Sequence, residues 1–161
     1  MKKITLLATS IILLIFLTGC TGYKPIFNSQ DMKFKITKSS ITGDQKLGKQ
    51  LYLKMENMSR AQKNNPDAKM LSVKIDIVKD KSATATSSTG KILEYKITIT
   101  SKIEVENNQN NEKILDQNFT HSSSYKIQDQ YSDTIIQENK IIKNLIDNIY
   151  QELLIKLSQR I

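Results

Sequence analysis

Few residues of this chain have the type and spacing to do chemistry, and one group of them suggests hydrolysis. His121, the only histidine, directly precedes Ser122–Ser124, and an imidazole beside a serine can take the hydroxyl proton during nucleophilic attack. The serines lack the Gly-x-Ser-x-Gly turn that exposes such a nucleophile. The nearest carboxylates in sequence, Asp116 and Asp129, suggest no fixed relay. We therefore expect His121 at a strand end or on the surface, and a hydrolase is the weakest hypothesis.

A second pattern imitates a phosphate-binding loop. Residues 43–50 read Gly-Asp-Gln-Lys-Leu-Gly-Lys-Gln, but Gln50 lacks the hydroxyl that binds magnesium in the Gly-x-x-x-x-Gly-Lys-Ser/Thr motif. One histidine and one cysteine also exclude the two-histidine metal motifs and zinc sites built from clustered thiolates. We therefore expect no enzymatic activity, no metal site and no cofactor.

The single cysteine closes an amino-terminal leader. Residues 1–3 are basic at two positions, residues 4–17 are almost all apolar, and the composition turns polar after the cysteine. This pattern is typical of a secretory signal peptide, and the apolar run is shorter than the roughly 20 residues of a membrane-spanning helix. The end of the leader resembles the bacterial lipobox, whose cysteine is diacylated on sulfur, freed by cleavage and acylated again on nitrogen by chains such as palmitate. The lipobox residues are Leu17, Thr18, Gly19 and Cys20.

Domain limits and cellular address follow from this leader. We expect a signal peptide over residues 1–19, a lipidated tether over 20–31 and one domain over 32–161, since one core usually serves roughly 100–200 residues. Thr21 stands where aspartate would retain a lipoprotein in the inner membrane, which predicts an outer-membrane protein facing the periplasm. The net charge of +8 favours anionic partners such as lipid phosphates, and export argues against nucleic acid.

Apolar periodicity predicts four strands and two helices. Alternating patterns predict strands over about 32–37, 71–77, 93–105 and 115–127, with residues 82–90 as a long hairpin tip or a mobile loop. Helical spacing predicts one helix from Gln45 to just before Pro66, and another over the last ~30 residues with Ser132 as its N-cap. The apolar stripe of the second helix comprises Ile135, Ile142, Ile146, Ile149, Leu153 and Leu157, widened by Leu145 and Leu154.

These elements predict the fold class. Both helices are amphipathic and need an apolar face to cover, and the regular alternation over residues 93–105 indicates a sheet with one face on the core and one in water. We predict an α+β two-layer sandwich of order β-α-β-β-β-α, with a four-stranded, mostly antiparallel sheet and both helices on one face.

Lysines around the predicted sheet have two interpretations. Lys74, Lys96 and Lys102 fall on its predicted wet face. They could contact lipid phosphates, to which lysine binds as a point charge, or belong to a solvated face whose lysines block aggregation between sheet edges. The second interpretation is the more common one for half-buried sheets. The candidate lipid-phosphate contacts are Lys79, Lys81, Lys91 and Lys96, the first three flanking the predicted hairpin tip.

The segment after the cysteine carries a family resemblance. Residues 22–27, Gly-Tyr-Lys-Pro-Ile-Phe, resemble the Cys-Gly-Phe-x-Pro-Leu-Tyr opening of the lipopolysaccharide-assembly lipoproteins of the LptE family, with Thr21 inserted after the cysteine. The element order extends the resemblance over residues 20–161. The residues of the family-like motif are Gly22, Tyr23, Pro25, Ile26 and Phe27.

The resemblance implies a structural role. Members of that family plug a large outer-membrane β-barrel, LptD, assist its assembly and are associated with lipopolysaccharide on its way to the cell surface. Their fold, two helices on a four-stranded sheet, agrees with the one predicted here, whereas no lipid-contacting residue of the family transfers to this chain. The alternative is a lipid-binding accessory lipoprotein of a phospholipid transport system, which needs an apolar cavity rather than a filled core.

Overall fold

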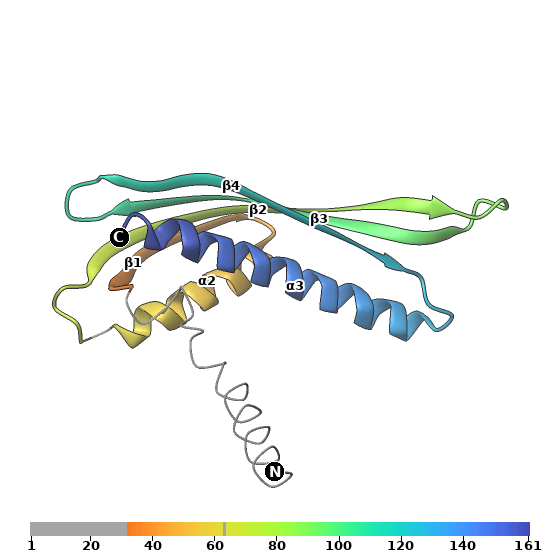
Figure 1. Ribbon diagram of the computed structural model, residues 1–161, viewed down its shortest axis with the longest axis horizontal. Coiled ribbons are helices and arrows are strands. Elements are labelled where there is room, and N and C mark those ends of the chain that lie inside the picture. Colours follow the sequence, from red (N-terminus) through yellow and green to blue (C-terminus); the bar gives the residue numbers. More distant parts are fainter. Residues whose placement is uncertain (1–31, 63) are drawn as a thin grey trace, which may run out of the picture.

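The computed structural model describes residues 32–62 and 64–161, so the predicted leader, lipobox, tether and family-like motif lie outside the described residues. The elements follow the predicted order, and both helices lie on the same side of the sheet (Figure 1). Their bounds are β1 Phe34–Gly43, α2 Gln45–Ala61, β2 Lys69–Thr86, β3 Ile92–Asn107, β4 Lys113–Lys126 and α3 Tyr131–Ser158.

The sheet is mixed, with strand order β1-β2-β3-β4. β2, β3 and β4 pair antiparallel, whereas β1 pairs parallel to β2, from Phe34 opposite Lys69 to Gly43 opposite Ile77. A parallel pair needs a crossover connection, and α2 supplies it. The prediction of a mostly antiparallel sheet is therefore confirmed, with one parallel pair at the edge.

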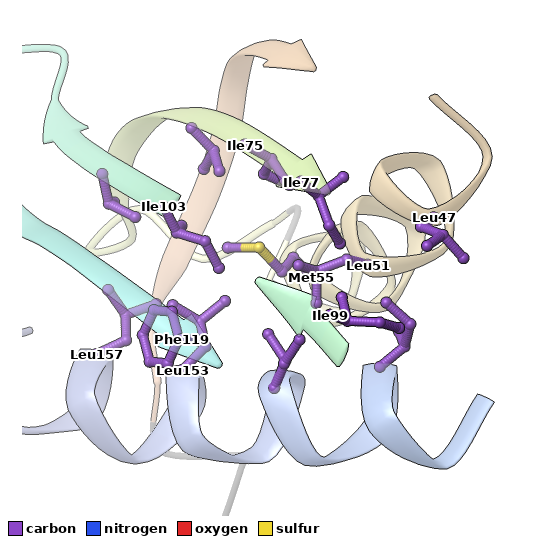
Figure 2. Close-up of a cluster of buried hydrophobic side chains, with 14 of the residues drawn as sticks. Leu47, Leu51, Met55, Ile75, Ile77, Ile99, Ile103, Phe119, Leu153 and Leu157 are labelled. Atoms are coloured by element: carbon purple, nitrogen blue, oxygen red, sulfur yellow. The ribbon is translucent and has the colours of Figure 1, made fainter. Parts of the chain in front are cut away.

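The core lies between the sheet and the two helices. Alternate residues of β2 and β3 point their apolar side chains to the helix side, where α2 and α3 cover them (Figure 2). Burial of this apolar surface stabilises the fold by roughly 25 cal/mol for each Å² that is removed from water. The largest side chains that are almost completely buried are Phe34, Phe119, Leu51, Met55, Leu71, Ile75, Ile77, Ile97, Ile99, Ile103, Leu115 and Ile146.

The turn from β1 into α2 explains the pattern that imitates a phosphate-binding loop. Gly43 has φ of +77°, and the Asp44 side chain caps α2 by accepting hydrogen bonds from the amides of Lys46 and Leu47, both at 3.1 Å. Gly48 lets α2 approach the strands, because a Cβ there would collide with Ile41. The glycines and the aspartate therefore serve a strand-to-helix turn, and β1 extends beyond the predicted residues 32–37 to reach it.

The prediction of a long tip over residues 82–90 is wrong. β2 continues to Thr86, and the tip is a short turn closed by hydrogen bonds between Gly90 and Ser87 and between Ser87 and Lys91. The small polar residues of this stretch tolerate extended backbone, and pairing with β3 satisfies the amides and carbonyls of alternate residues. The hairpin is consequently longer than the sequence suggested, with register shifts near its end between Ala83 and Thr86.

The start of α3 also differs from the prediction. The helix begins at Tyr131 with Gln130 at the N-cap position, so Ser132 lies inside it. Ile135 is 37% exposed, whereas Thr134 is buried, and the Thr134 hydroxyl accepts a hydrogen bond from the Gln128 amide at 2.9 Å. Farther along, the predicted stripe is largely confirmed. Ile142 and Leu154 are partly buried, and Ile141, which the stripe did not include, is buried. The buried residues of the predicted stripe are Leu145, Ile146, Ile149, Leu153 and Leu157.

One core position carries a polar group without a partner. The Ser101 hydroxyl is fully buried on the helix side of β3 and makes no hydrogen bond. Since burying an unsatisfied hydroxyl costs about 1–3 kcal/mol, we expect Ser101→Ala to leave stability unchanged or to raise it by up to about 1 kcal/mol. Urea unfolding of both proteins measures the difference, and a loss above about 1 kcal/mol would show that the hydroxyl is satisfied in solution.

Candidate functional site

The structure separates the predicted lysines into two faces. Lys96 lies on the outer face of the sheet, together with Lys74 and Lys102 as predicted, and Lys91 lies beside the hairpin turn. Lys79 and Lys81 share the parity of the buried residues of β2 and therefore face the helices. Because β2 is longer than expected, neither of these two lysines lies at the tip.

Two lysines on the outer face, Lys74 and Lys102, form ion pairs with acidic side chains of the sheet. Lys102 lies 2.9 Å from Glu104 and 3.8 Å from Asp116, and Lys74 lies 3.7 Å from Glu104 and 3.6 Å from Glu106. The hydrogen bond from Lys102 and its charge lower the pKa of Glu104. These exposed pairs fit the interpretation of a solvated face. Lys96, the predicted lipid-phosphate contact on this face, forms no ion pair with a described residue.

Lys81 is engaged by a cluster that joins the hairpin to α3. Its Nζ lies 2.6 Å from Oε2 of Glu138, the same oxygen that accepts the Tyr125 hydroxyl at 2.6 Å. Nζ also lies 4.3 Å from the centroid of the Tyr95 ring, within the range of a cation–π interaction. We call these four residues the Glu138 cluster. Lys81 would have to leave it before contacting a phosphate.

The Glu138 cluster shifts the pKa values of its members. Partial burial disfavours the charged form of Glu138, but the hydrogen bonds from Lys81 and Tyr125 outweigh it and lower the pKa of the carboxyl. Burial likewise opposes the charge of Lys81, whose interactions with Glu138 and Tyr125 raise its pKa on balance. Burial, followed by the bond to Glu138, raises the pKa of Tyr125. All three groups are therefore held in their ordinary neutral-pH charge states.

We expect Glu138→Gln to destabilise the protein by about 1 kcal/mol at pH 7, because it removes the charge of a partly buried pair whose lysine is 33% exposed. A carboxyl with a lowered pKa stabilises the fold above its unfolded pKa, and this contribution is lost as pH falls through the folded value. The difference between the two proteins should therefore shrink below about pH 4.5, the ordinary value. Urea unfolding at several pH values measures it.

Glu56→Gln is the matched control for this substitution. Glu56 pairs with Arg60 at 3.1 Å, one turn apart on α2, and the Arg60 side chain is 68% exposed. Such pairs contribute about 0.3–0.5 kcal/mol, so this variant should stay close to the native protein. Equal effects of the two substitutions at pH 7 would contradict a structural role for the Glu138 cluster.

A groove of about 490 Å³ lies between the amino-terminal parts of α2 and α3, with Lys79 of β2 in its lining. Lys54 on its wall is paired with Asp147 at 2.7 Å, whereas Lys46 and Lys143 form no ion pair with a described residue. This lining suits an anionic amphiphile, because the lysines would bind its negative charge and the apolar side chains would contact its hydrocarbon. The apolar lining is Leu47, Leu53 and Ile142.

The sequence predicted only one residue of this groove, Lys79, as a lipid-phosphate contact. Lys46 and Lys143 were missed because they belong to helices whose relative position no local pattern shows. The signal that places Lys79 and Lys81 on the helix face was present, since both continue the odd-numbered series of apolar residues in β2.

His121 does not form a catalytic arrangement with the adjacent serines. It faces α3, where its Nε2 lies 2.9 Å from Oε2 of Glu152, a partner 31 residues away that the sequence did not indicate. Ser122 and Ser124 point to the opposite face by strand alternation, and no serine hydroxyl bonds His121 within residues 32–62 and 64–161. The hydrogen bond between His121 and Glu152 therefore connects β4 to α3.

Two further observations concern the described part of the chain only. It contains no group of three or more histidine, cysteine, aspartate or glutamate side chains that could hold a metal ion. None of its helices has the combination of length and apolar character required to cross a membrane. The lipidation site at Cys20 lies outside these residues.

Comparisons with known proteins relate this chain to others through its fold. No family model matches it, and no curated protein matches its sequence. Among solved structures, it resembles the uncharacterized lipoprotein B from Nitrosomonas europaea, with 16% identity, 83% of this chain and 88% of that chain covered, and a TM-score of 0.55. It also resembles the minor lipoprotein from Acinetobacter baumannii, with 19% identity, coverages of 76% and 90%, and a TM-score of 0.51. The chain therefore shares its fold with bacterial lipoproteins.

Proposed function

We propose that this protein is a lipid-anchored, periplasm-facing lipoprotein of the outer membrane that acts as a structural and assembly subunit in lipopolysaccharide transport. In this role it plugs a large LptD-like β-barrel and has no enzymatic activity. The observation that carries the proposal is the joining of a lipobox at Cys20 to a fold shared with bacterial lipoproteins. The family-like motif over residues 22–27 directs it to the LptE family.

The outer face of the sheet supports the plug role. It carries hydroxyl groups and paired charges, among them the hydroxyls of Thr100 and Thr120 at 3.2 Å and the pair of Lys102 with Glu104. The interior of a transmembrane β-barrel is polar, so this face suits a barrel lumen better than a lipid surface. In a barrel lumen, the lysines of this face would meet polar side chains and water rather than lipid.

Contact with lipopolysaccharide is the finer part of the proposal. Its phosphates would meet lysines that form no ion pair with a described residue, namely Lys46, Lys79 and Lys143 at the groove and Lys91 and Lys96 on the hairpin. Lys81, a predicted contact, is a weaker candidate because the Glu138 cluster holds it. A phospholipid carrier, the alternative, requires an apolar cavity, whereas the described buried apolar side chains pack into one cluster, part of which Figure 2 shows.

A pull-down tests the plug role directly. Full-length protein with a carboxy-terminal tag is purified from detergent-solubilised outer membrane, and mass spectrometry identifies what co-purifies. We expect a stoichiometric large β-barrel that stays bound at high salt, and reduced levels of assembled barrel in a deletion strain. Recovery of inner-membrane transporter subunits, or an unchanged barrel level without this protein, would overturn the proposal in favour of the lipid carrier.

A further inference from the structure

The outer half of β2 has an edge that no described strand covers. β1 pairs with β2 only as far as Gly43 opposite Ile77, whereas β2 continues against β3 to Thr86. Figure 1 shows β2 and β3 continuing beyond β1. Within residues 32–62 and 64–161 the sheet contains only its four strands, so the position in line with β1 past Gly43 is open there.

The hydrogen bond at the end of β1 shows which residues of β2 face this edge. The Asp44 amide donates to the Ile77 carbonyl at 2.8 Å, so the backbone groups of Ile77 point toward β1. The amide and carbonyl of one strand residue point to the same side, and the side alternates along the strand. Lys79, Lys81 and Ala83 therefore direct their amides and carbonyls to the open edge.

The features of this edge restrict which strand can be added to it. Proteins discourage strand pairing at an edge with proline, short strands, β-bulges or inward-pointing charged side chains, above all lysine. The stretch from Val78 to Thr86 contains no proline, and the irregular register of β2 against β3 begins only after Ala83. Lys79 and Lys81 point to the helix side, and their positive charges oppose a basic strand but not an acidic one.

The chemistry of an added strand follows from the groove beside the edge. Alternate side chains of a strand continuing the line of β1 would point to the helix side and enter the groove that Lys79 lines. They would meet Lys46 and Lys143, together with the apolar wall of Leu47 and Ile142. The two carboxylates of the lining are already engaged, because Asp44 caps α2 and Glu138 pairs with Lys81. Acidic side chains at alternate positions complement this lining.

We propose that the β2 edge at Lys79, Lys81 and Ala83 binds an extended acidic segment of a partner protein by strand addition. The inference does not depend on the proposed role in lipopolysaccharide transport. It uses a recognition mode in which backbone hydrogen bonds give affinity and alternate side chains give specificity. Here the specificity comes from the lysines of the groove.

Two other occupants fit less well. A second copy would set Lys79 and Lys81 against the same lysines, and like charges across a strand pair destabilise it. The tether that cleavage before Cys20 would leave has no residues to spare for pairing at this edge, because β1 starts at the far end of the sheet. Reaching from residue 32 to the position opposite Lys79 takes about 40 Å, the full extended length of residues 20–31.

The test uses the full chain, purified in detergent, and a labelled peptide of alternating threonine and glutamate, with alternating threonine and lysine as control. We expect saturable binding of the acidic peptide by fluorescence anisotropy and none of the basic one. Amide hydrogen exchange followed by NMR should slow about tenfold at Lys79, Lys81 and Ala83, whereas Asp80 and Ser82, which point to β3, should not change. Binding without this alternation, or equal binding of both peptides, would overturn the inference.

Substitutions at Ala83 provide a second arm. Ala83→Pro removes the outward amide and is tolerated on an open edge, so it should weaken peptide binding about tenfold, whereas Ala83→Val keeps the amide and should bind normally. Equal binding by the two variants would count against strand addition. If Ala83→Pro disturbs the hairpin, the exchange pattern of the unaltered protein still decides. Concentration-dependent protection of the edge without peptide would instead identify a second copy as the occupant.

Discussion

Gly43→Ala is expected to destabilise the protein by about 3 kcal/mol or more, a large part of the stability of a domain this size. Gly43 has φ of +77°, in the left-handed region that costs an L-residue about 1–2 kcal/mol. An added Cβ would also lie far inside the van der Waals distance of the Ile77 carbonyl oxygen. That oxygen accepts the Asp44 amide at 2.8 Å, so moving it would disturb the turn into α2. Urea unfolding measures the loss.

Gly90→Ala is the matched control. Gly90 has φ of +83°, but a Cβ there would meet no atom within 4 Å. This variant therefore isolates the backbone cost, about 1–2 kcal/mol, from the collision at Gly43. Similar losses in the two variants would contradict the close approach of the Gly43 turn to β2.

The same turn shows what the sequence could predict about local structure. The pattern at residues 43–50 was rejected as a nucleotide site because Gln50 lacks a hydroxyl. The close approach of Gly48 to Ile41 was not predicted, because a glycine inside a helix gives no sign of what packs against it. A helix cap depends on residues that are adjacent in the sequence, whereas close packing depends on residues that are distant in it.

The element order and the faces of β3 were predictable for a physical reason. A strand buried on one face must alternate, and the residues from Ile97 to Val105 do so without interruption. The start of α3 was not predictable by the same rule. Ile135 matches the apolar stripe but lies where the helix has little of the core to cover, and it stays exposed. Periodicity gives the direction of a side chain, and the extent of the neighbouring layer decides whether it is buried.

The candidate site was less accessible from sequence than the fold. Its partners come from separate elements: Glu138 of α3 holds Lys81 of β2, and Glu152 of α3 holds His121 of β4. The lysines were recognised as charges but not as members of pairs, because an ion pair needs the position of both groups. Strand parity could have placed Lys81 on the helix face, and that would have made it a poor candidate for lipid contact.

Cys20→Ala is the second substitution with a large expected effect, and it acts on location rather than stability. Each buried CH₂ of an acyl chain contributes about 0.8 kcal/mol to membrane binding, so several chains anchor a protein firmly whereas one does so only marginally. Without the thiol, neither the diacylglyceryl group nor the amine acylation that follows cleavage can form. We expect recovery in the outer-membrane fraction to fall to background, measured by membrane fractionation, and mass spectrometry to find no acylated amino terminus.

Thr21→Asp separates anchoring from sorting. The cysteine is kept, so this variant should remain acylated and sediment with membranes, but aspartate after the cysteine should direct it to the inner membrane. It should then fail to co-purify with an outer-membrane barrel although its domain, residues 32–161, is unaltered. Wild-type recovery of Cys20→Ala in the outer membrane would contradict the lipid anchor. Wild-type recovery of Thr21→Asp would contradict only the sorting rule, and leave the anchor in place.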